Sequence, residues 1–327
     1  MEKRMESVLD RSGTVFRSIR SNIIIFIVLF ALIVFADIVA PGFMSFGHLN
    51  TISRQAAYLG IVSIGQTMVL ISRGVDLSVG STITVSSVMG AWIMSAQNEN
   101  VPLALAVTLG LGLAIGLTNG LGIHFLKIPP LLMTLAMSSV TFGTLLVYTR
   151  GAPRGASAPI LTEISTGRFM DTIHYSVLIW ILLAAIAMLI MHKTVFGRDL
   201  YAVGANSTAA KYSGVKVGRT IITVYMISGF TAAVAGMLLI GFTRNSYLEA
   251  GNAFTFDSIS AVVIGGTSVA GGSGGYVGTI AGAFIMIILI SLLTIINIPQ
   301  AGRFIVQGII IIVMLLLIYR KGRVKGK

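Results

Sequence analysis

Hydroxyl and amide side chains recur in or beside the apolar segments of this chain, and their types suit contact with a neutral polar solute. Each carries hydrogen-bond donors, acceptors or both. The candidates for lining a path through the protein, with one carboxylate among them, are Gln66, Asp76, Ser78, Ser81, Asn119, Thr134, Ser138 and Thr141. Membrane Ser and Thr residues can instead bond to a helix carbonyl one turn back, and that alternative stays open for each hydroxyl.

Two of these candidates stand in the stretch RGVDLSVGS, residues 73–81. Asp76 and Ser78 precede an apolar run, and both are types whose side-chain oxygens accept from unpaired N–H groups at a helix start. A capped turn is one interpretation. A broken helix that exposes N–H groups, Gln66 and Ser81 toward a polar path is the other, and both can hold together.

A second stretch, AVVIGGTSVAGGSGGYVGT at 261–279, is rich in glycine although it lies between apolar runs. A phosphate-binding P-loop needs a Lys after its last Gly, and none follows here, so nucleotide binding is not expected. Close packing of helices is the simplest role for its glycines. Paired glycine-interrupted segments can also mark a transport site, and Val-Gly-Ser at 79–81 resembles Val-Gly-Thr at 277–279. The structural glycines are Gly265, Gly266, Gly271, Gly272 and Gly278.

The residues needed for catalysis, metal binding or ion-coupled transport are few in this sequence. The chain has no cysteine, and its four histidines are scattered, so we expect neither catalytic residues nor a metal site. A transporter driven by protons or sodium usually carries ionisable groups within the membrane. Here Asp37 and His124 fall near segment ends and Asp76 falls in a loop, so none is expected at mid-membrane. Such an ion-coupled transporter of a small polar solute remains the main alternative.

The elements that must position these residues are membrane helices. The chain of 327 residues is 55% hydrophobic and 10% charged, whereas soluble proteins carry about 25% charged residues. A helix needs about 20 residues to cross a bilayer. We therefore predict an all-α polytopic membrane protein of about ten transmembrane helices, some of them broken. The predicted spans are 22–40, 56–71, 79–96, 101–126, 130–149, 175–191, 221–242, 258–269, 279–296 and 304–319.

Basic residues orient the predicted bundle, because cytoplasmic loops of membrane proteins are enriched in Lys and Arg. With both termini cytoplasmic, six arginines lie outside and the remaining 17 of the 23 basic residues lie inside. The net charge of +12 is thus explained without nucleic acid. The organisation is a cytoplasmic segment 1–21, one transmembrane domain 22–319 and a basic cytoplasmic tail 320–327. Trp92 and Trp180, near outer ends of spans, are predicted interfacial anchors.

The longest internal cytoplasmic loop, residues 192–220, contains glycines and the alanine-rich stretch Ser207 to Lys211. This stretch could form a short helix between flexible hinges. The loop is either an ordinary basic connection or a docking surface, through which a pore without its own ATP site would couple to an energy source.

Three motifs together carry a family resemblance: GVDLSVGS, FGRDLYAVGANSTAAKYSGV and AVVIGGTSVAGGSGG. In this order and spacing they resemble the permease subunit of ATP-binding-cassette importers of the ribose and monosaccharide type, over about Pro41 to Tyr319. The resemblance implies import of a monosaccharide, a pentose or hexose, across the inner (plasma) membrane of a bacterium. It also implies a second permease subunit, identical or different, a cytoplasmic ATPase that binds ATP and Mg, and an extracytoplasmic solute-binding protein.

Within the loop 192–220, the resemblance implies a coupling segment that docks in the ATPase. Its residues are Gly197, Arg198, Ala202, Gly204, Asn206, Ala209, Ala210 and Gly214. The chain departs from its relatives at 255–256, at Ser273 and around 291–297, which leaves the identity of the sugar open.

Overall fold

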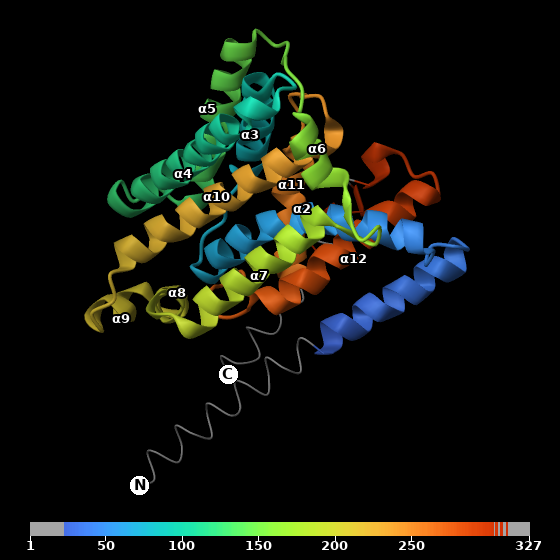
Figure 1. Cartoon of the computed structure of the whole chain (residues 1–327). Helices are drawn as coiled ribbons and strands as arrows, with labels where there is room; N and C mark the ends of the chain where they lie inside the picture. The colour runs from blue at the N-terminus through green and yellow to red at the C-terminus, as the bar shows by residue number, and fades with distance from the viewer. Residues whose placement is uncertain (1–22, 304, 307, 310–311, 313–327) are drawn as a thin grey trace.

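The computed structural model of the protein describes residues 23–303, 305, 306, 308, 309 and 312 (Figure 1). Most of this part of the chain is helical. A helix at Ile23–Val39 comes first. Further helices are α2 (Phe46–Ile71), α3 (Val79–Met94), η1 (Asn98–Asn100), α4 (Val101–Phe125), α5 (Pro130–Thr149), α6 (Pro159–Thr166), α7 (Tyr175–Lys193), α8 (Val195–Ala205), α9 (Ser207–Tyr212), α10 (Val217–Thr243), α11 (Asn252–Ile264) and α12 (Tyr276–Ile295). The described residues from 300 onward are also helical.

The lengths and compositions of the helices make this an all-α membrane protein. Five helices are long and apolar enough to cross a bilayer: Asn98–Phe125, α5, α7, α10 and α12. The helix Ile23–Val39, α3 and α11 are shorter but also apolar. Most of the predicted span 304–319, together with the terminal segments 1–21 and 320–327, lies outside the described residues.

Two predicted spans have different bounds in the structure. α2 begins at Phe46 rather than at residue 56. Its first ten residues include several polar ones, so a search for apolar runs does not detect this part of the helix. One of them, Arg54, is held by an aromatic ring: its guanidinium lies 4.5 Å from the centroid of the Phe242 ring. α11 covers Asn252–Ile264 rather than 258–269. It ends where Gly266 takes a φ of 83° and donates its N–H to Val263 O, an arrangement that glycine adopts readily.

The loop between α5 and α7 contains structure that the sequence did not predict. α6 is followed by β1 (Arg168–Phe169) and β2 (Ile173–His174), which pair antiparallel with Arg168 opposite His174. Pro159 stands at the start of α6, where its missing N–H costs no helical bond. These short elements cover one end of the bundle.

α10 runs through the middle of the bundle and packs against α4, α3 and α2 (Figure 1). Its crossing with α4 depends on two glycines: a Cβ on Gly112 would collide with the carbonyl oxygen of Gly229, and a Cβ on Gly229 with that of Gly112. Small residues let membrane helices approach to backbone contact, which compensates for the weak hydrophobic drive between helices in lipid.

The connections gather at two opposite ends of α10. Near its start, Gly272 N donates to Ile71 O and the Arg73 guanidinium donates to Ala205 O. Beyond its other end, Ser157 N donates to Arg244 O and Ala96 N to Ala156 O. Residues 71–73, 205 and 272, all from segments predicted to be cytoplasmic, therefore meet at one end of α10, and residues 96, 156–157 and 244, from segments predicted to lie outside, meet at the other.

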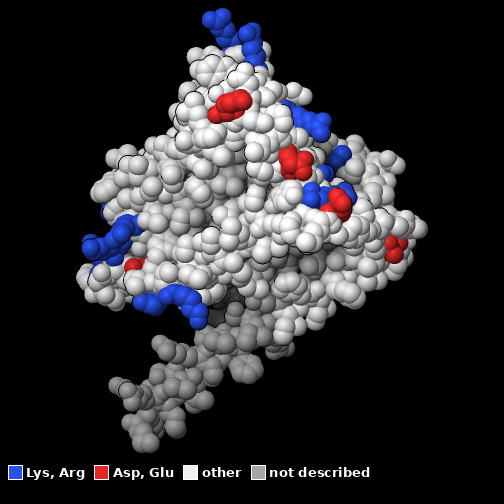
Figure 2. Space-filling model, viewed as in Figure 1, with Lys and Arg blue, Asp and Glu red and all other residues white. Residues whose placement is uncertain are grey.

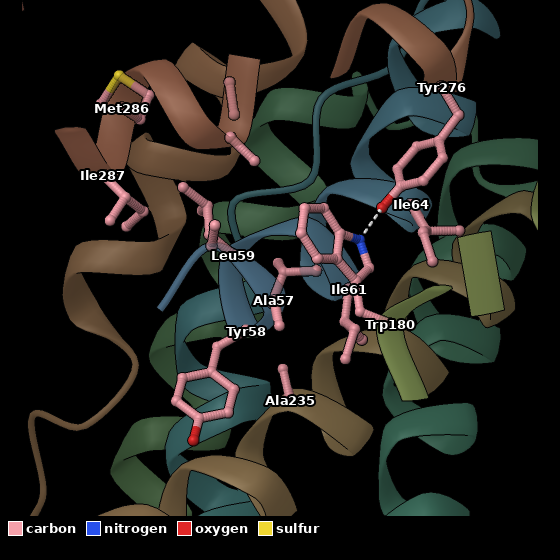
Figure 3. Packing of buried hydrophobic residues seen from close by; sticks show 14 of the residues in the cluster. Ala57, Tyr58, Leu59, Ile61, Ile64, Trp180, Ala235, Tyr276, Met286 and Ile287 are labelled. Carbon is pink, nitrogen blue, oxygen red and sulfur yellow. Dashed lines mark hydrogen bonds between the residues drawn. The ribbon is translucent and has the colours of Figure 1, made fainter. Parts of the chain in front are cut away.

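One predicted interfacial anchor is instead part of the core. Trp180 is 4% exposed, and its indole N–H donates to the Tyr276 hydroxyl at 2.6 Å (Figure 3). That hydroxyl in turn donates to Gly60 O at 2.7 Å. The prediction was wrong for Trp180 because hydropathy places a residue along a helix but does not say which way it faces. Trp92, by contrast, is about half exposed.

Candidate functional site

The chain breaks between α2 and α3, and a buried carboxylate lies at this break. Asp76 is 1% exposed. Its Oδ1 accepts from Ser78 N at 2.9 Å and from Ser78 Oγ at 2.6 Å, and its Oδ2 accepts from Ser228 Oγ at 2.7 Å. Ser228 is near the middle of α10. Asp76 therefore lies in the predicted break between two helices, and this break folds back into the bundle instead of facing solvent.

Two further helices hold the break. Asn119 of α4 donates from Nδ2 to Ser78 Oγ at 2.8 Å. Thr134 of α5 accepts from Leu77 N at 3.1 Å, and its hydroxyl lies 3.2 Å from Val75 O. Four predicted candidates, Asp76, Ser78, Asn119 and Thr134, are thus brought together around residues 75–78. Non-helical backbone within a membrane bundle needs such partners, since lipid offers none.

The cap predicted for α3 is arranged differently from the expectation. Ser78 is the N-cap residue, but its side chain accepts no bond from the helix and donates to Asp76 instead. Asp76 binds the N–H of Ser78 just before the helix begins. The polar side chains therefore tie the break to neighbouring helices more than they cap α3.

Several buried polar atoms of the predicted pathway residues have no hydrogen-bond partner among the described residues. They are both amide atoms of Gln66, Oδ1 of Asn119 and Oγ1 of Thr141. Buried polar atoms are nearly always satisfied in folded proteins, so unpaired ones call for an explanation. Side chains of this kind can bind water or a polar solute when the helices around them separate.

The remaining candidates make no hydrogen bond with the side chains of Asp76, Asn119 or Thr134 among the described residues. The hydroxyl of Ser81 donates to Ser78 O at 2.9 Å, which is the local helix bond that the sequence left open. Ser138 is half-buried on α5, between Thr134 and Thr141. In the described conformation these side chains pack between helices rather than line an open channel.

The opposite end of α3 and α5 holds a cavity of about 470 Å³. Trp92 and Tyr148 line it with their rings edge to face and 5.3 Å apart, and Arg150 and Arg154 complete the wall. The polar break and this aromatic recess therefore lie at different ends of the same pair of helices.

The glycine-rich stretch forms a tight return from α11 to α12. Gly265 and Gly278 are in backbone contact, since a Cβ on Gly265 would lie 2.6 Å from the carbonyl carbon of Gly278. Gly266, Gly271 and Gly272 have φ values of 83°, 80° and 70°, which side chains disfavour. All five predicted structural glycines are in this return or in the first turn of α12.

The loop after α7 consists of two helices, α8 and α9. The sequence predicted a short helix at Ser207 to Lys211, and α9 covers Ser207–Tyr212; α8 was not predicted. Thr194 accepts from Gly197 N at 3.2 Å, and Asn206 accepts from Ala209 N at 3.0 Å, so each helix has a side-chain N-cap. The turn after α9 contains Gly214 at a φ of 84°.

The eight predicted coupling residues divide by exposure. Gly197, Gly204 and Ala210 are buried, and Ala202 is half-buried. The exposed ones are Arg198, Asn206, Ala209 and Gly214. This second group is the part of the predicted coupling residues most open to a partner protein. Figure 2 shows basic side chains gathered over the α8–α9 end of the molecule.

Sequence reasoning missed four residues that the fold brings into these regions. Ser228 bonds Asp76, Arg73 and Tyr201 bond across the α8 end, and Tyr212 on α9 is 88% exposed. No local pattern marks Ser228, because its partner comes from another helix. An aromatic residue just after the predicted short helix, in a basic cytoplasmic loop, could have drawn attention to Tyr212.

Comparison with known proteins identifies the family. Residues 48–315 match the family described as "Branched-chain amino acid transport system / permease component". The chain belongs to this family. The matched residues include the break, the α8–α9 loop and the glycine-rich return.

Curated relatives of this permease cover nearly all of the chain. It is 33% identical to the ribose import permease protein RbsC of Bacillus subtilis (strain 168) over 90% of this chain and 92% of that protein. It is 32% identical to the fructose import permease protein FrcC of Rhizobium meliloti, over 88% and 82%. The galactose/methyl galactoside import permease protein MglC of Escherichia coli (strain K12) is 30% identical over 88% and 90%. No solved structure matches the permease.

Proposed function

We propose that the chain is the transmembrane permease subunit of an ATP-driven importer of a monosaccharide, a pentose or a hexose. One observation carries the proposal: relatives named as ribose, fructose and galactose import permeases match it over 88–90% of its length. The role is transport, and ATP hydrolysis belongs to a separate subunit. The individual sugar stays open because the relatives themselves differ in sugar.

The proposed topology has ten spans with both termini in the cytoplasm, in a bacterial inner (plasma) membrane. The excess of basic residues on one side supports this orientation. The end of the bundle that carries α8 and α9 is then cytoplasmic, and the end with Trp92 and Tyr148 faces outward.

The proposed assembly contains a second permease subunit, cytoplasmic ATPase subunits that bind ATP and Mg, and an extracytoplasmic solute-binding protein. The exposed face of α9 supports ATPase docking here. Ala209, Lys211 and Tyr212 are exposed, while Ala210 is buried and anchors the helix to the bundle.

A neutral sugar needs hydrogen-bonding groups along its path rather than a fixed countercharge. Gln66, Asn119 and Thr141 carry buried atoms with free hydrogen-bonding capacity, which supports a path near the α2–α3 break. Asp76 would act mainly by orienting Ser78 and Ser228, because both of its oxygens are already occupied. ATP binding would move α8 and α9 and rearrange the helices around the break.

The alternative of ion-coupled transport would use Asp76 as its ionisable group. The comparisons favour the importer, since the relatives that match over nearly the whole chain are import permeases of the same family. Three hydrogen-bond donors on Asp76 also suit a fixed structural carboxylate.

The first test is purification of the tagged chain from its native membranes in mild detergent, with mass spectrometry of the proteins that accompany it. We expect an ATPase subunit in equal amount. The Ala209→Asp variant should lose the ATPase, because it adds a charge to the exposed face of α9. Gln97→Glu adds a charge at the other end of the bundle and should retain the ATPase.

The second test is uptake by proteoliposomes that contain the purified complex, its binding protein and a panel of monosaccharides. Uptake should require ATP and persist when an ionophore removes ion gradients. Uptake that collapses with the ionophore and survives ATP depletion would instead establish the ion-coupled alternative.

A further inference from the structure

Three segments distant in sequence meet at the cytoplasmic end of the bundle. Ile71 is the last residue of α2, and its carbonyl oxygen accepts from Gly272 N at 2.9 Å. Carbonyls at a helix end have no partner within the helix, so the glycine-rich return supplies one. A Cβ on Gly204, next to last in α8, would collide with the same Ile71 oxygen. We name the contact of Ile71, Gly204 and Gly272 the three-way junction.

The centre of this junction is mainly backbone, and the Arg73 side chain packs against Gly271. A Cβ on Gly272 would lie 2.8 Å from the Cα of Ala205, and one on Gly271 would lie 2.9 Å from Gly204 O. Glycine is needed here because three backbones approach within van der Waals contact. Gly204, predicted to contact the ATPase, faces this junction instead and is buried.

Two side chains fasten the junction from either side. Arg73 donates from Nη2 to Ala205 O at 2.6 Å, and Ala205 is the last residue of α8. A cation at a helix C-terminus also interacts favourably with the helix dipole. Tyr201 donates its hydroxyl proton to Gly274 O at 3.0 Å. Burial raises the pKa of Tyr201 to about 12, so this donor keeps its proton at neutral pH.

Arg73 stands three residues before Asp76, in the same break between α2 and α3. The Arg73 bond therefore joins α8 to the break that holds the buried polar cluster, and the Tyr201 bond joins α8 to the return between α11 and α12. A movement of α8 would act on both segments at once.

We propose that Arg73 and Tyr201 are positioning residues that transmit movement of the α8–α9 loop to the α2–α3 break and to the α11–α12 return. The proposal rests on the importer function above and adds which residues carry the movement. The junction moves as one unit, since its backbones interlock and the two side chains prevent them from sliding apart.

The coupling test uses the complete importer in proteoliposomes, with Arg73→Gln and Tyr201→Phe. Both variants should bind the ATPase and hydrolyse ATP as the wild type does, because neither side chain is on the exposed face of α9. For Arg73→Gln, the number of sugar molecules transported per ATP hydrolysed should fall by at least about tenfold. This is the factor that corresponds to the loss of one hydrogen bond to a charged group. Arg73→Lys should restore part of the ratio. Lys127→Gln, an exposed cation at the same end, should leave it unchanged. An unchanged ratio in both variants would overturn the proposal.

A distance measurement tests the same idea without transport. The chain has no cysteine, so spin labels can be attached at Ser207→Cys on α9 and Ala270→Cys in the return, both exposed. The distance between the labels should stay constant when ATP is added to the wild-type complex, and its distribution should broaden in Tyr201→Phe. A wild-type distance that lengthens with ATP would show that the junction separates, which contradicts the proposal.

Failure of the proposed function gives a different result. A chain that binds no ATPase would show neither ATP hydrolysis nor ATP-dependent change in any variant. A chain that binds ATPase and transports sugar normally without Arg73 and Tyr201 would refute only the inference about these two residues.

Discussion

Asp76 and Ser228 are 152 positions apart in the chain, yet the Ser228 hydroxyl donates to Asp76 Oδ2 at 2.7 Å. This bond fixes the break between α2 and α3 against the middle of α10. A buried carboxylate is costly unless donors surround it, and here the donors come from Ser78 and Ser228. The residues predicted to contact a solute are thus held by a network that spans several helices.

Asp76→Asn should weaken this network. The amide replaces one acceptor oxygen with an NH₂ group, so the donors of Ser78 and Ser228 compete for the oxygen that remains. We expect a loss of about 1–3 kcal/mol in the free energy of unfolding and slower uptake with normal ATPase binding. Thermal unfolding in detergent and uptake in proteoliposomes measure the two effects.

Asp37→Asn is the control, because Asp37 accepts from Met44 N in an exposed bond. Equal losses in both variants would contradict the special role of Asp76.

Gly112→Ala should destabilise the crossing of α4 with α10. Its new Cβ would collide with Gly229 O, and the two helices would have to separate. Overpacking of this kind costs about 1–3 kcal/mol. Gly110→Ala, two residues away on the same helix, has nothing within 4 Å of its Cβ and should be neutral or slightly stabilising. Thermal unfolding of the two variants side by side gives the comparison, and equal midpoints would argue against the close crossing.

Tyr276→Phe should leave the indole N–H of Trp180 buried without its acceptor, and Gly60 O with its helical donor only. The expected loss is about 1–3 kcal/mol. The chain has only two tryptophans, so a change in the emission of the buried one can be followed directly. Tyr148→Phe changes an exposed tyrosine near the end of α5 and serves as the control. The idea fails if both Phe variants unfold at the same temperature.

Stability should fall in mild acid partly because of His174, at the start of α7. Burial, and then the nearby Arg54 charge, lower the pKa of His174 below its ordinary value. The unfolded chain, with a pKa of about 6.5, therefore takes up a proton first as the pH falls. The contribution of neutral His174 is complete above about pH 6.5 and is lost as the pH drops toward its folded pKa.

Melting temperatures at about pH 7.5 and 5.5 test this dependence. The wild type should lose more melting temperature between the two than His174→Gln, which cannot take up a proton. A variant as sensitive to acid as the wild type would assign the effect to other groups.

Much of the architecture follows from the sequence alone. Runs of apolar residues placed α4, α5, α7, α10 and α12 close to their predicted bounds, because a membrane helix is selected by its own composition. The alanine-rich stretch after Asn206 gave α9 for a similar local reason. The three motifs identified the class of permease, which the matched family and the sugar import permeases among the relatives then confirmed.

Side-chain direction and long-range contact were decided only by the tertiary structure. Hydropathy put Trp180 at a membrane surface and Asp76 in a loop, yet both are buried. Nothing in the sequence around Gly204 indicates that it packs against the Ile71 carbonyl and the Gly272 nitrogen, since those contacts need three segments to meet. Composition specifies which segments enter the membrane because the free energy of transfer into the bilayer is a sum over the residues of one segment. Which groups meet inside depends on how all the helices pack together, and no single segment contains that information.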